Sequence, residues 1–196
     1  MDVTLRAFFK AVSMQSRKTT SEVIFMSISM SSASLPICVT MLGNLSHFLD
    51  KAQEFIDTRK CEVTALTLYR LAPDMLPFTR QIQIACDAAK NGVARISGMD
   101  APKFEDSEAT IAELKTRVQK TLDYLKSVPA AKLDGTESKE ITFPSGRDTT
   151  RTMQAEAYLK HVMLPNMFFH VTMAYAILRH NGVDLGKKDY LAGAGA

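Results

Sequence analysis

The sequence predicts an all-α fold, a four-helix bundle with a small β-hairpin before the last helix. Three segments of the 196-residue chain repeat apolar residues at steps of three and four, which places them on one face of a helix, and a fourth segment is apolar nearly all round. One short stretch alternates apolar and polar residues instead, as a half-buried strand does. Helices joined by short links bury their apolar faces most simply against one another, and this favours the bundle.

The first helix is predicted to start at Ser34 and to run through Ile56, because its apolar spacing persists over that length. Ser34 is a suitable N-cap, and Pro36 in the first turn lacks an N–H that would be unpaired there anyway. We expect a linker with a short turn to follow from Cys61 to Asp74.

The second helix is predicted over residues 78–96, with Pro77 in its first turn and Gly98 beyond its end. Polar residues also recur at helical spacing within it. We expect this polar stripe to be a solvent-exposed face, and it consists of Arg80, Gln83, Asp87, Lys90 and Asn91.

The third helix is predicted to begin near Asp106 or Ser107 and to run to Leu125. Its apolar residues again follow steps of three and four. Glu113 precedes Arg117 by four residues, which is the favourable order for an exposed ion pair on a helix.

The hairpin is predicted over residues 139–153, between the third and fourth helices. Ile141 and Phe143 alternate with polar residues, the segment 144–146 (Pro-Ser-Gly) is typical of a turn, and residues 149–153 would form the returning strand. Because the segment is rich in Thr and Arg, we expect it on the surface of the protein.

The fourth helix differs from the others, because residues 162–178 are apolar nearly all round. Seventeen such residues almost suffice to cross a membrane, but Pro165, Asn166 and His170 interrupt the segment. We therefore expect no membrane span and place this helix at the centre of the bundle, where every side is covered.

The composition excludes several classes of protein. With 46% hydrophobic and 23% charged residues, the chain is typical of a soluble globular protein. A net charge of +3, without any run of five like charges, argues against a nucleic-acid partner. Neither a disulfide framework nor a zinc ribbon is expected, because no CxxC spacing occurs. We expect inert thiols at Cys38, Cys61 and Cys86.

The chain is predicted to divide into a leader, one domain and a short tail. Residues 26–191 would form the helical-bundle domain, and residues 192–196 a flexible tail. Residues 1–25 are basic, rich in hydroxyl groups and poor in acids, as an organelle transit peptide is. The alternatives are a disordered leader or an upstream start codon, with Met26 or Met30 as the true beginning. We expect a cytoplasmic protein, or a mitochondrial one if the leader is a transit peptide.

Asn166 and His170 are the first candidates for a functional site. Their i, i+4 spacing places them side by side on a helix that is expected to be buried, where polar groups need partners. This face either lines a pocket for a ligand or metal, or forms a satisfied internal hydrogen-bond network. Asp87 could complete a mixed site with His170, but no HxxxH or HExxH pair exists, and we predict no metal site.

The remaining candidates lie on the second helix and just before it. Arg70 and Asp74 bracket a Leu-Ala-Pro segment, and we expect them to pin the start of the second helix. No catalytic residue or cofactor is assigned from these patterns. The complete set of candidate ligand-binding residues is Asn166, His170, Gln83, Asp87, Arg70 and Asp74.

Five strings of the sequence carry a resemblance to a known family of bacterial and fungal proteins. They are MSISM at 26–30, RLAPDM at 70–75, QIQIACDAAK at 81–90, PNMFFHVTMAYAILRHNGV at 165–183 and LGKKDYL at 185–191. On these strings the chain resembles the uncharacterised family called domain of unknown function nineteen ninety-three. The resemblance implies a four-helix bundle of the DinB-like or YfiT-like type.

Better-studied members of that superfamily include metal-dependent thiol transferases, which typically use a His triad with two members spaced HxxxH. This sequence departs from that pattern. The fourth position after His170 is Ala174, and Asp87 stands where a His of the second helix is expected. The resemblance therefore implies the fold without the metal chemistry.

We expect a soluble helical-bundle protein with a small pocket for a small-molecule ligand and without a His-triad metal site. The alternative is a metal-dependent transferase-like enzyme of the DinB superfamily. A homodimer is also expected, because the Met- and Phe-rich fourth helix has more apolar surface than one small bundle needs, and because DinB-like bundles often pair. Neither a nucleic acid nor a membrane is expected as a partner.

Overall fold

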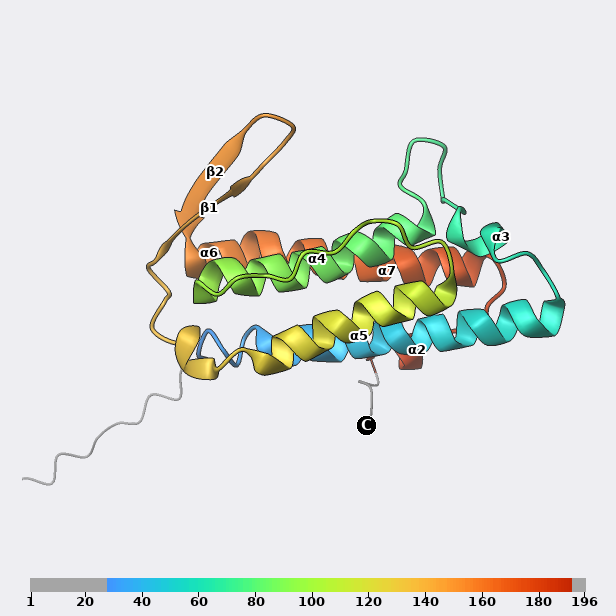
Figure 1. The fold of residues 1–196 in the computed structure, drawn as a ribbon, viewed down its shortest axis with the longest axis horizontal. Coiled ribbons are helices and arrows are strands. Elements are labelled where there is room, and N and C mark those ends of the chain that lie inside the picture. Colours follow the sequence, from blue (N-terminus) through green and yellow to red (C-terminus); the bar gives the residue numbers. More distant parts are fainter. Residues whose placement is uncertain (1–27, 192–196) are drawn as a thin grey trace, which may run out of the picture.

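A computed structural model of the chain describes residues 28–191, and these form a bundle of long helices with a hairpin at one end (Figure 1). The predictions for the leader (1–25) and the tail (192–196) concern residues outside this described part. The long helices are α2 (Leu35–Arg59), α4 (Phe78–Ser97), α5 (Ile111–Ser127) and a last stretch made of α6 (Ala155–Tyr158), the π-helical turn η2 (Leu159–Met163) and α7 (Leu164–His180). Short helical turns are α3 (Thr64–Thr67), η1 (Ala130–Lys132) and α8 (Lys187–Leu191).

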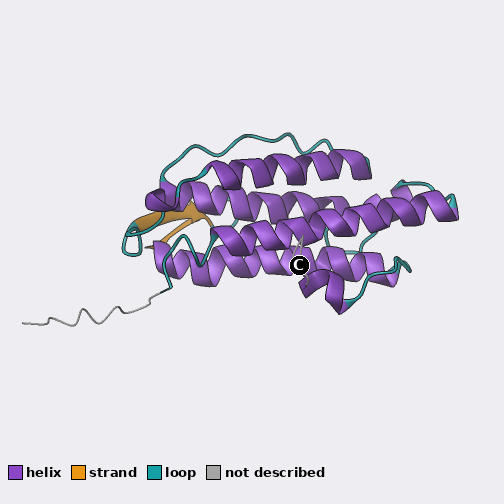
Figure 2. Cartoon of the chain, turned by 90° about the horizontal axis from the view of Figure 1, so that it is seen from below, coloured by secondary structure: helices purple, strands orange, loops and turns teal. Residues whose placement is uncertain are grey.

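The long helices form a ring in which α2 packs against α5 and α7, and α4 packs against the same two helices. Helices α2 and α7 run in one direction, and α4 and α5 run in the other (Figure 1). Because α4 and α5 follow each other in the chain and are parallel, their link must return along the whole bundle. This crossover loop, residues 98–110, lies along the outside of the helices (Figure 2). The predicted four-helix bundle is confirmed.

The helix ends follow local chemistry. Helix α2 begins at Leu35 as expected, but the Ser34 hydroxyl donates to the Met30 carbonyl at 2.6 Å and caps no helical N–H. Helix α4 ends at Gly98, whose φ of 75° is the left-handed conformation that glycine adopts without strain.

Helix α5 starts at Ile111, so the prediction of a start near Asp106 or Ser107 is wrong. A capping box ends the crossover loop there, with the Thr110 side chain accepting from the Glu113 N–H and the Glu113 carboxylate accepting from the Thr110 N–H. The residues before Thr110 are thereby left free to contact the bundle as a loop.

The last helical stretch contains the π-helical turn η2, which adjusts the register between α6 and α7. Helix α4 lies very close to this turn. A Cβ atom at Gly92 would stand 2.5 Å from Met163 Cγ and Sδ, so glycine is required for this approach.

The prediction that the fourth helix is central is wrong, because α7 occupies a corner of the ring like the other long helices. A corner helix keeps one side outward, and Phe169 on that side is 52% exposed. The continuous stretch Ala155–His180 is 26 residues long, and its most apolar 18-residue window has a mean hydropathy of 1.2 and is 39% buried. By length and composition alone, this stretch could cross a membrane. A core helix of a soluble bundle passes the same test.

The hairpin is confirmed as β1 (Glu140–Pro144) and β2 (Thr150–Gln154), paired antiparallel with Glu140 opposite Gln154. The alternation seen in the sequence places Ile141 and Phe143 on the inner face. The Phe143 ring lies 4.8 Å from that of Tyr158, measured between centroids, and this contact attaches the hairpin to α6.

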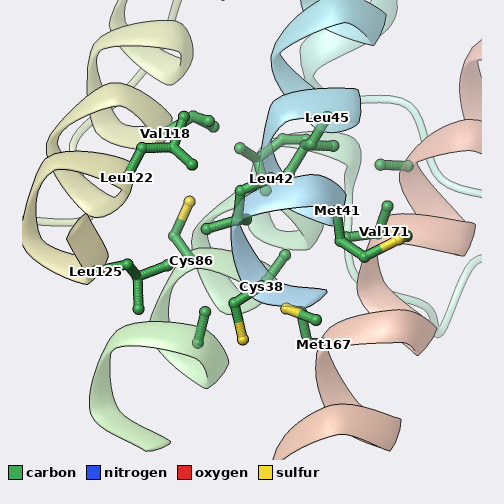
Figure 3. Packing of buried hydrophobic residues seen from close by; sticks show 14 of the residues in the cluster. Cys38, Met41, Leu42, Leu45, Cys86, Val118, Leu122, Leu125, Met167 and Val171 are labelled. Atoms are coloured by element: carbon green, nitrogen blue, oxygen red, sulfur yellow. The ribbon is translucent and has the colours of Figure 1, made fainter. Parts of the chain in front are cut away.

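Apolar side chains from all four long helices meet in the core, as Figure 3 shows for Cys38, Leu42, Cys86, Leu122 and Met167 among others. Burial raises the pKa of the Cys38 and Cys86 thiols to about 12, so both stay protonated and inert at neutral pH. Cys61 is half-buried in the turn after α2.

Candidate functional site

His170 lies on α7 and faces α4, with 8% of its surface exposed. Its Nδ1 atom lies 2.7 Å from Oε1 of Gln81. Gln81 is also buried, and its Nε2 donates to the Leu76 carbonyl at 2.8 Å. Three residues from α4, from the loop before it and from α7 are therefore connected in one chain of hydrogen bonds.

This chain determines the tautomer of His170. Because the amide Nε2 of Gln81 donates to the Leu76 carbonyl, the amide oxygen must face the imidazole. An oxygen only accepts, so Nδ1 of His170 carries the hydrogen and donates it. The Nε2 atom is left with its lone pair, as a hydrogen-bond acceptor or a ligand atom.

The surroundings keep the imidazole neutral. Burial, aided by the positive charge of Arg80, lowers the pKa of His170 from 6.5 to about 4. The ring of Phe169 stands perpendicular to the imidazole, with 5.1 Å between the ring centroids. The site thus combines a neutral acceptor, a nearby cation and an exposed aromatic ring.

Asn166 does not join His170, because it is exposed. One i, i+4 step turns about 40° around an α-helix. The buried arc of α7 is centred on Met167, Val171 and Ala174, so His170 falls at its edge and Asn166 falls outside it. The predicted buried pair is wrong for this reason.

Gln83 and Asp87 lie with the crossover loop and α5 and do not line a site with His170. Gln83 Nε2 donates to Glu108 Oε2 at 2.7 Å, and Arg117 Nη2 donates to Asp87 Oδ1 at 2.8 Å. The predicted solvent-exposed stripe is also wrong, since Gln83 is 1% and Lys90 is 4% exposed. The crossover loop covers this face, and the sequence carries no direct signal of where that loop lies.

Arg117 is the centre of the charged network under the crossover loop. Only 2% of it is exposed. Its Nη1 lies 2.9 Å from Glu108 Oε1 and 3.0 Å from Asp106 Oδ1, and its Nη2 contacts Asp87. Burial acts to lower the pKa of the guanidinium, but Glu108 and Asp87 outweigh it and raise that pKa.

The predicted exposed pair between Glu113 and Arg117 is wrong, because Glu113 caps α5 while Arg117 points under the loop. A sequence signal for the burial of Arg117 did exist. The position falls three residues after Leu114 and four before Thr121, both of which are buried. The apolar spacing of α5 therefore passes through Arg117.

Arg70 and Asp74 are both exposed and form no ion pair with each other. Arg70 Nη1 reaches only the Pro73 carbonyl, at 3.5 Å. Two other hydrogen bonds fix the start of α4. The Thr79 hydroxyl donates to the Thr67 carbonyl at 2.9 Å, and the Phe78 N–H donates to the Tyr69 carbonyl. The predicted role of Arg70 and Asp74 at this helix start is wrong.

The His triad of the metal-dependent relatives does not fit the residues near His170. His170 is hydrogen-bonded to the amide of Gln81 and feels the charge of the Arg80 guanidinium, and neither group is an ordinary metal ligand. Asp87 is engaged with Arg117 and Lys90. Within residues 28–191, no three His, Cys, Asp or Glu side chains are grouped so that they could hold a metal ion.

Two comparisons with known proteins agree with this fold. A crystal structure of a DinB family member protein from Shewanella denitrificans is 39% identical in sequence and superposes with a TM-score of 0.75, over 85% of this chain and 92% of that one. No curated protein matches the sequence. The family model described as Domain of unknown function (DUF1993) matches residues 30–191, almost the whole described part. The chain therefore belongs to the DUF1993 family and has the helical bundle of a DinB family protein.

Proposed function

We propose that this protein binds a small organic molecule at His170, whose Nε2 accepts a hydrogen bond from the ligand. The site works without a His-triad metal. The observation that carries the proposal is the hydrogen-bond chain from the Leu76 carbonyl through Gln81 to His170. It holds the imidazole in one tautomer and one orientation before any ligand arrives, which lowers the cost of ordering the site on binding.

The charges around His170 define the class of ligand. Arg80 disfavours a cation, so the ligand is neutral or anionic and offers an O–H or N–H to Nε2. Phe169 supplies an exposed aromatic face next to the imidazole for an apolar part of the same molecule. A few polar groups beside an apolar surface are the usual composition of a small-molecule site.

The low pKa of His170 favours binding over proton abstraction. A catalytic base works best with a pKa near the working pH. At a pKa of about 4 the imidazole is neutral at pH 7 but is a weak base. It is therefore suited to accept a hydrogen bond, and less suited to remove a proton from a substrate.

The test is a ligand-observed NMR screen of a library of neutral and anionic fragments against the full chain. Fragments that bind at the site are expected to bind the wild type and to lose binding in His170→Phe, which keeps a ring but removes the acceptor. His161→Phe is the matched control, since His161 lies on the same helical stretch and is exposed. Circular dichroism verifies that each variant is folded.

Two results would contradict the proposal. In the first, every fragment that binds the wild type also binds His170→Phe equally well. In the second, Zn²⁺ or Ni²⁺ binds the untagged protein in equimolar amount and is lost in His170→Phe, which would favour the metal-dependent transferase-like alternative.

A further inference from the structure

Two buried polar atoms in residues 28–191 have no hydrogen-bond partner: Nε of Arg117 and the hydroxyl of Tyr124. A buried polar group without a hydrogen bond costs about 1–3 kcal/mol of stability. A ligand atom that pairs with either group would recover part of this free energy. Both residues belong to α5, and both lie against the crossover loop. Neither takes part in the site proposed at His170.

Each of these two residues lines a cavity between α5 and the crossover loop. The first cavity has a volume of about 370 Å³ and includes Lys103, Phe104, Arg117 and Lys120 in its wall. The second is an open cleft of about 540 Å³ and includes Phe104, Lys120 and Tyr124. Since Phe104 and Lys120 line both, the two cavities are neighbours.

The second cavity suits a flat ring. Pro102, Phe104 and Tyr124 give it a mainly apolar lining, and aromatic side chains pack well against a planar molecule. The Phe104 ring makes cation–π contacts with two side chains: Lys90 Nζ lies 5.1 Å and Arg117 Cζ lies 5.2 Å from the ring centroid.

The unpartnered groups act as hydrogen-bond donors. Nε of Arg117 can only donate, and both Nη atoms of this guanidinium are already occupied by Asp87, Asp106 and Glu108. Burial, with the charge of Asp100 nearby, raises the pKa of Tyr124, so its hydroxyl keeps its proton. A ligand that pairs with Nε of Arg117 must therefore present an acceptor atom, to which the Tyr124 hydroxyl can also donate.

The charge of the first cavity argues for a neutral acceptor. Its three cationic side chains are matched by three carboxylates, which are Glu105, Glu108 and Glu113. Neither a strongly anionic nor a cationic ligand gains from such a balanced lining. The second cavity is lined by Asp100 and Asp123 against Lys120 alone, and this disfavours an anion there. A carbonyl or carboxamide oxygen meets the donors without adding a charge.

We propose that the crossover loop and α5 form a second ligand site, for a neutral flat aromatic molecule that carries a carbonyl or carboxamide group. The ring lies in the cleft at Pro102, Phe104 and Tyr124. A shift of the neighbouring Phe104 and Lys120 side chains exposes the two buried donors, and the carbonyl oxygen accepts from Nε of Arg117 or from the Tyr124 hydroxyl. The ligand thereby also clamps the crossover loop onto α5.

The test uses three probes of equal ring size on the full chain: benzamide, benzoate and benzylamine. Each is titrated to about 10 mM while backbone amide shifts are followed by NMR, a range in which fragments of this size bind detectably. Benzamide is expected to shift the amides of residues 100–108 and 116–124 and to bind at least about threefold more tightly than the two charged probes.

Variants locate the site. Tyr124→Phe and Phe104→Leu are each expected to raise the Kd of benzamide about three- to tenfold. Tyr69→Phe, on the other side of the bundle near the end of α7, is the matched control and should leave the Kd unchanged.

The proposal fails if benzamide produces no shifts up to the highest concentration, or if its affinity is equal in Phe104→Leu and in the wild type. Shifts confined to residues around His170 and Gln81 would also overturn it, and would support the site proposed above. Stronger binding of benzoate than of benzamide would refute the neutral ligand class.

Discussion

His170 shows how a single buried side chain acquires a defined chemical state. The neighbouring amide of Gln81 fixes which ring nitrogen carries the hydrogen, and burial fixes the charge. Both effects depend on α4 and α7 packing against each other, since the two residues are 89 positions apart in the chain.

The charge state of His170 predicts how stability depends on pH. Its pKa is about 4 in the folded protein and 6.5 in the unfolded chain, so the unfolded chain binds the proton more readily. The stabilisation is complete above pH 6.5 and is lost as the pH falls towards 4, by about 2–3 kcal/mol. Chemical denaturation at pH 7 and pH 4.5 measures this loss.

His170→Gln is expected to lose this part of the pH dependence, because Gln has no charge to gain. His161→Gln should keep the wild-type pH dependence, since His161 is exposed. An NMR titration that gives His170 a pKa of 6.5 or higher would contradict the buried neutral imidazole.

Arg117 is expected to be the most sensitive charged residue. In Arg117→Met, the carboxylates of Asp87, Asp106 and Glu108 lose their shared cation. Asp87 and Asp106 are 34% and 41% exposed and can turn to water, so we expect a cost of about 1–3 kcal/mol of unfolding free energy. Denaturant unfolding measures the loss, and hydrogen exchange should become faster in residues 98–110. Arg147→Met, exposed in the hairpin turn, should change stability by less than about 0.5 kcal/mol. Equal stability of the two variants would show that the network contributes little.

At the scale of elements, the crossover loop packs over one face of α4 and shields that face from solvent. It has no helix or strand of its own, and ion pairs with Arg117 and Arg80 hold it in place. Partial burial acts to raise the pKa of Asp106, but Arg80 and Arg117 outweigh it and lower that pKa. The loop therefore keeps its negative charges towards the bundle at neutral pH.

The close approach of α4 to the π-helical turn gives a prediction about packing. Gly92→Ala would place a Cβ atom 2.5 Å from Met163 Cγ, and the buried Met163 has little room to yield, so we expect a loss of about 1–3 kcal/mol. Met163→Ala alone should cost about 2–5 kcal/mol through the cavity that it leaves. The double variant should lose clearly less than the sum, because each change relieves the other. Additive losses, measured by thermal and chemical unfolding, would refute this packing argument.

At the scale of the whole molecule, the outer side of the last helix is an apolar surface. No charged residue occurs between Lys160 and Arg179, and Phe169 is exposed. We expect two chains to pair through this surface, as a homodimer, because burying apolar area stabilises association. Pairing and the ligand proposed at His170 would then compete for the exposed ring of Phe169.

Light scattering at micromolar concentration is expected to report about 43 kDa, twice the 21.7 kDa of one chain. Met173→Glu, on the half-buried edge of this surface, should shift the protein to the monomer, whereas Lys160→Glu should leave the dimer intact. A single species of monomer mass in the wild type would rule out this pairing.

The sequence by itself determined the secondary structure of this protein, because periodicity and end signals are local. Apolar steps of three and four indicated α2, α4 and α5, and a nearly continuous apolar segment indicated α7. Alternation at Ile141 and Phe143 indicated the hairpin, and Gly98 indicated the end of α4. It placed the start of α5 too early, since a loop held by ion pairs resembles a polar helix start until its distant partners are known.

Only the tertiary structure decided which polar residues meet. Gln81 and Gln83 are two positions apart, a turn of about 200°, so one contacts His170 on α7 and the other Glu108 in the crossover loop. The sequence predicted the polar stripe of α4 as a solvent-exposed face, and the crossover loop covers that stripe instead. Local spacing gives the angle of a side chain around its own helix. The partner at that angle is set by how helices far apart in the chain pack, because the burial of their shared apolar faces selects one arrangement.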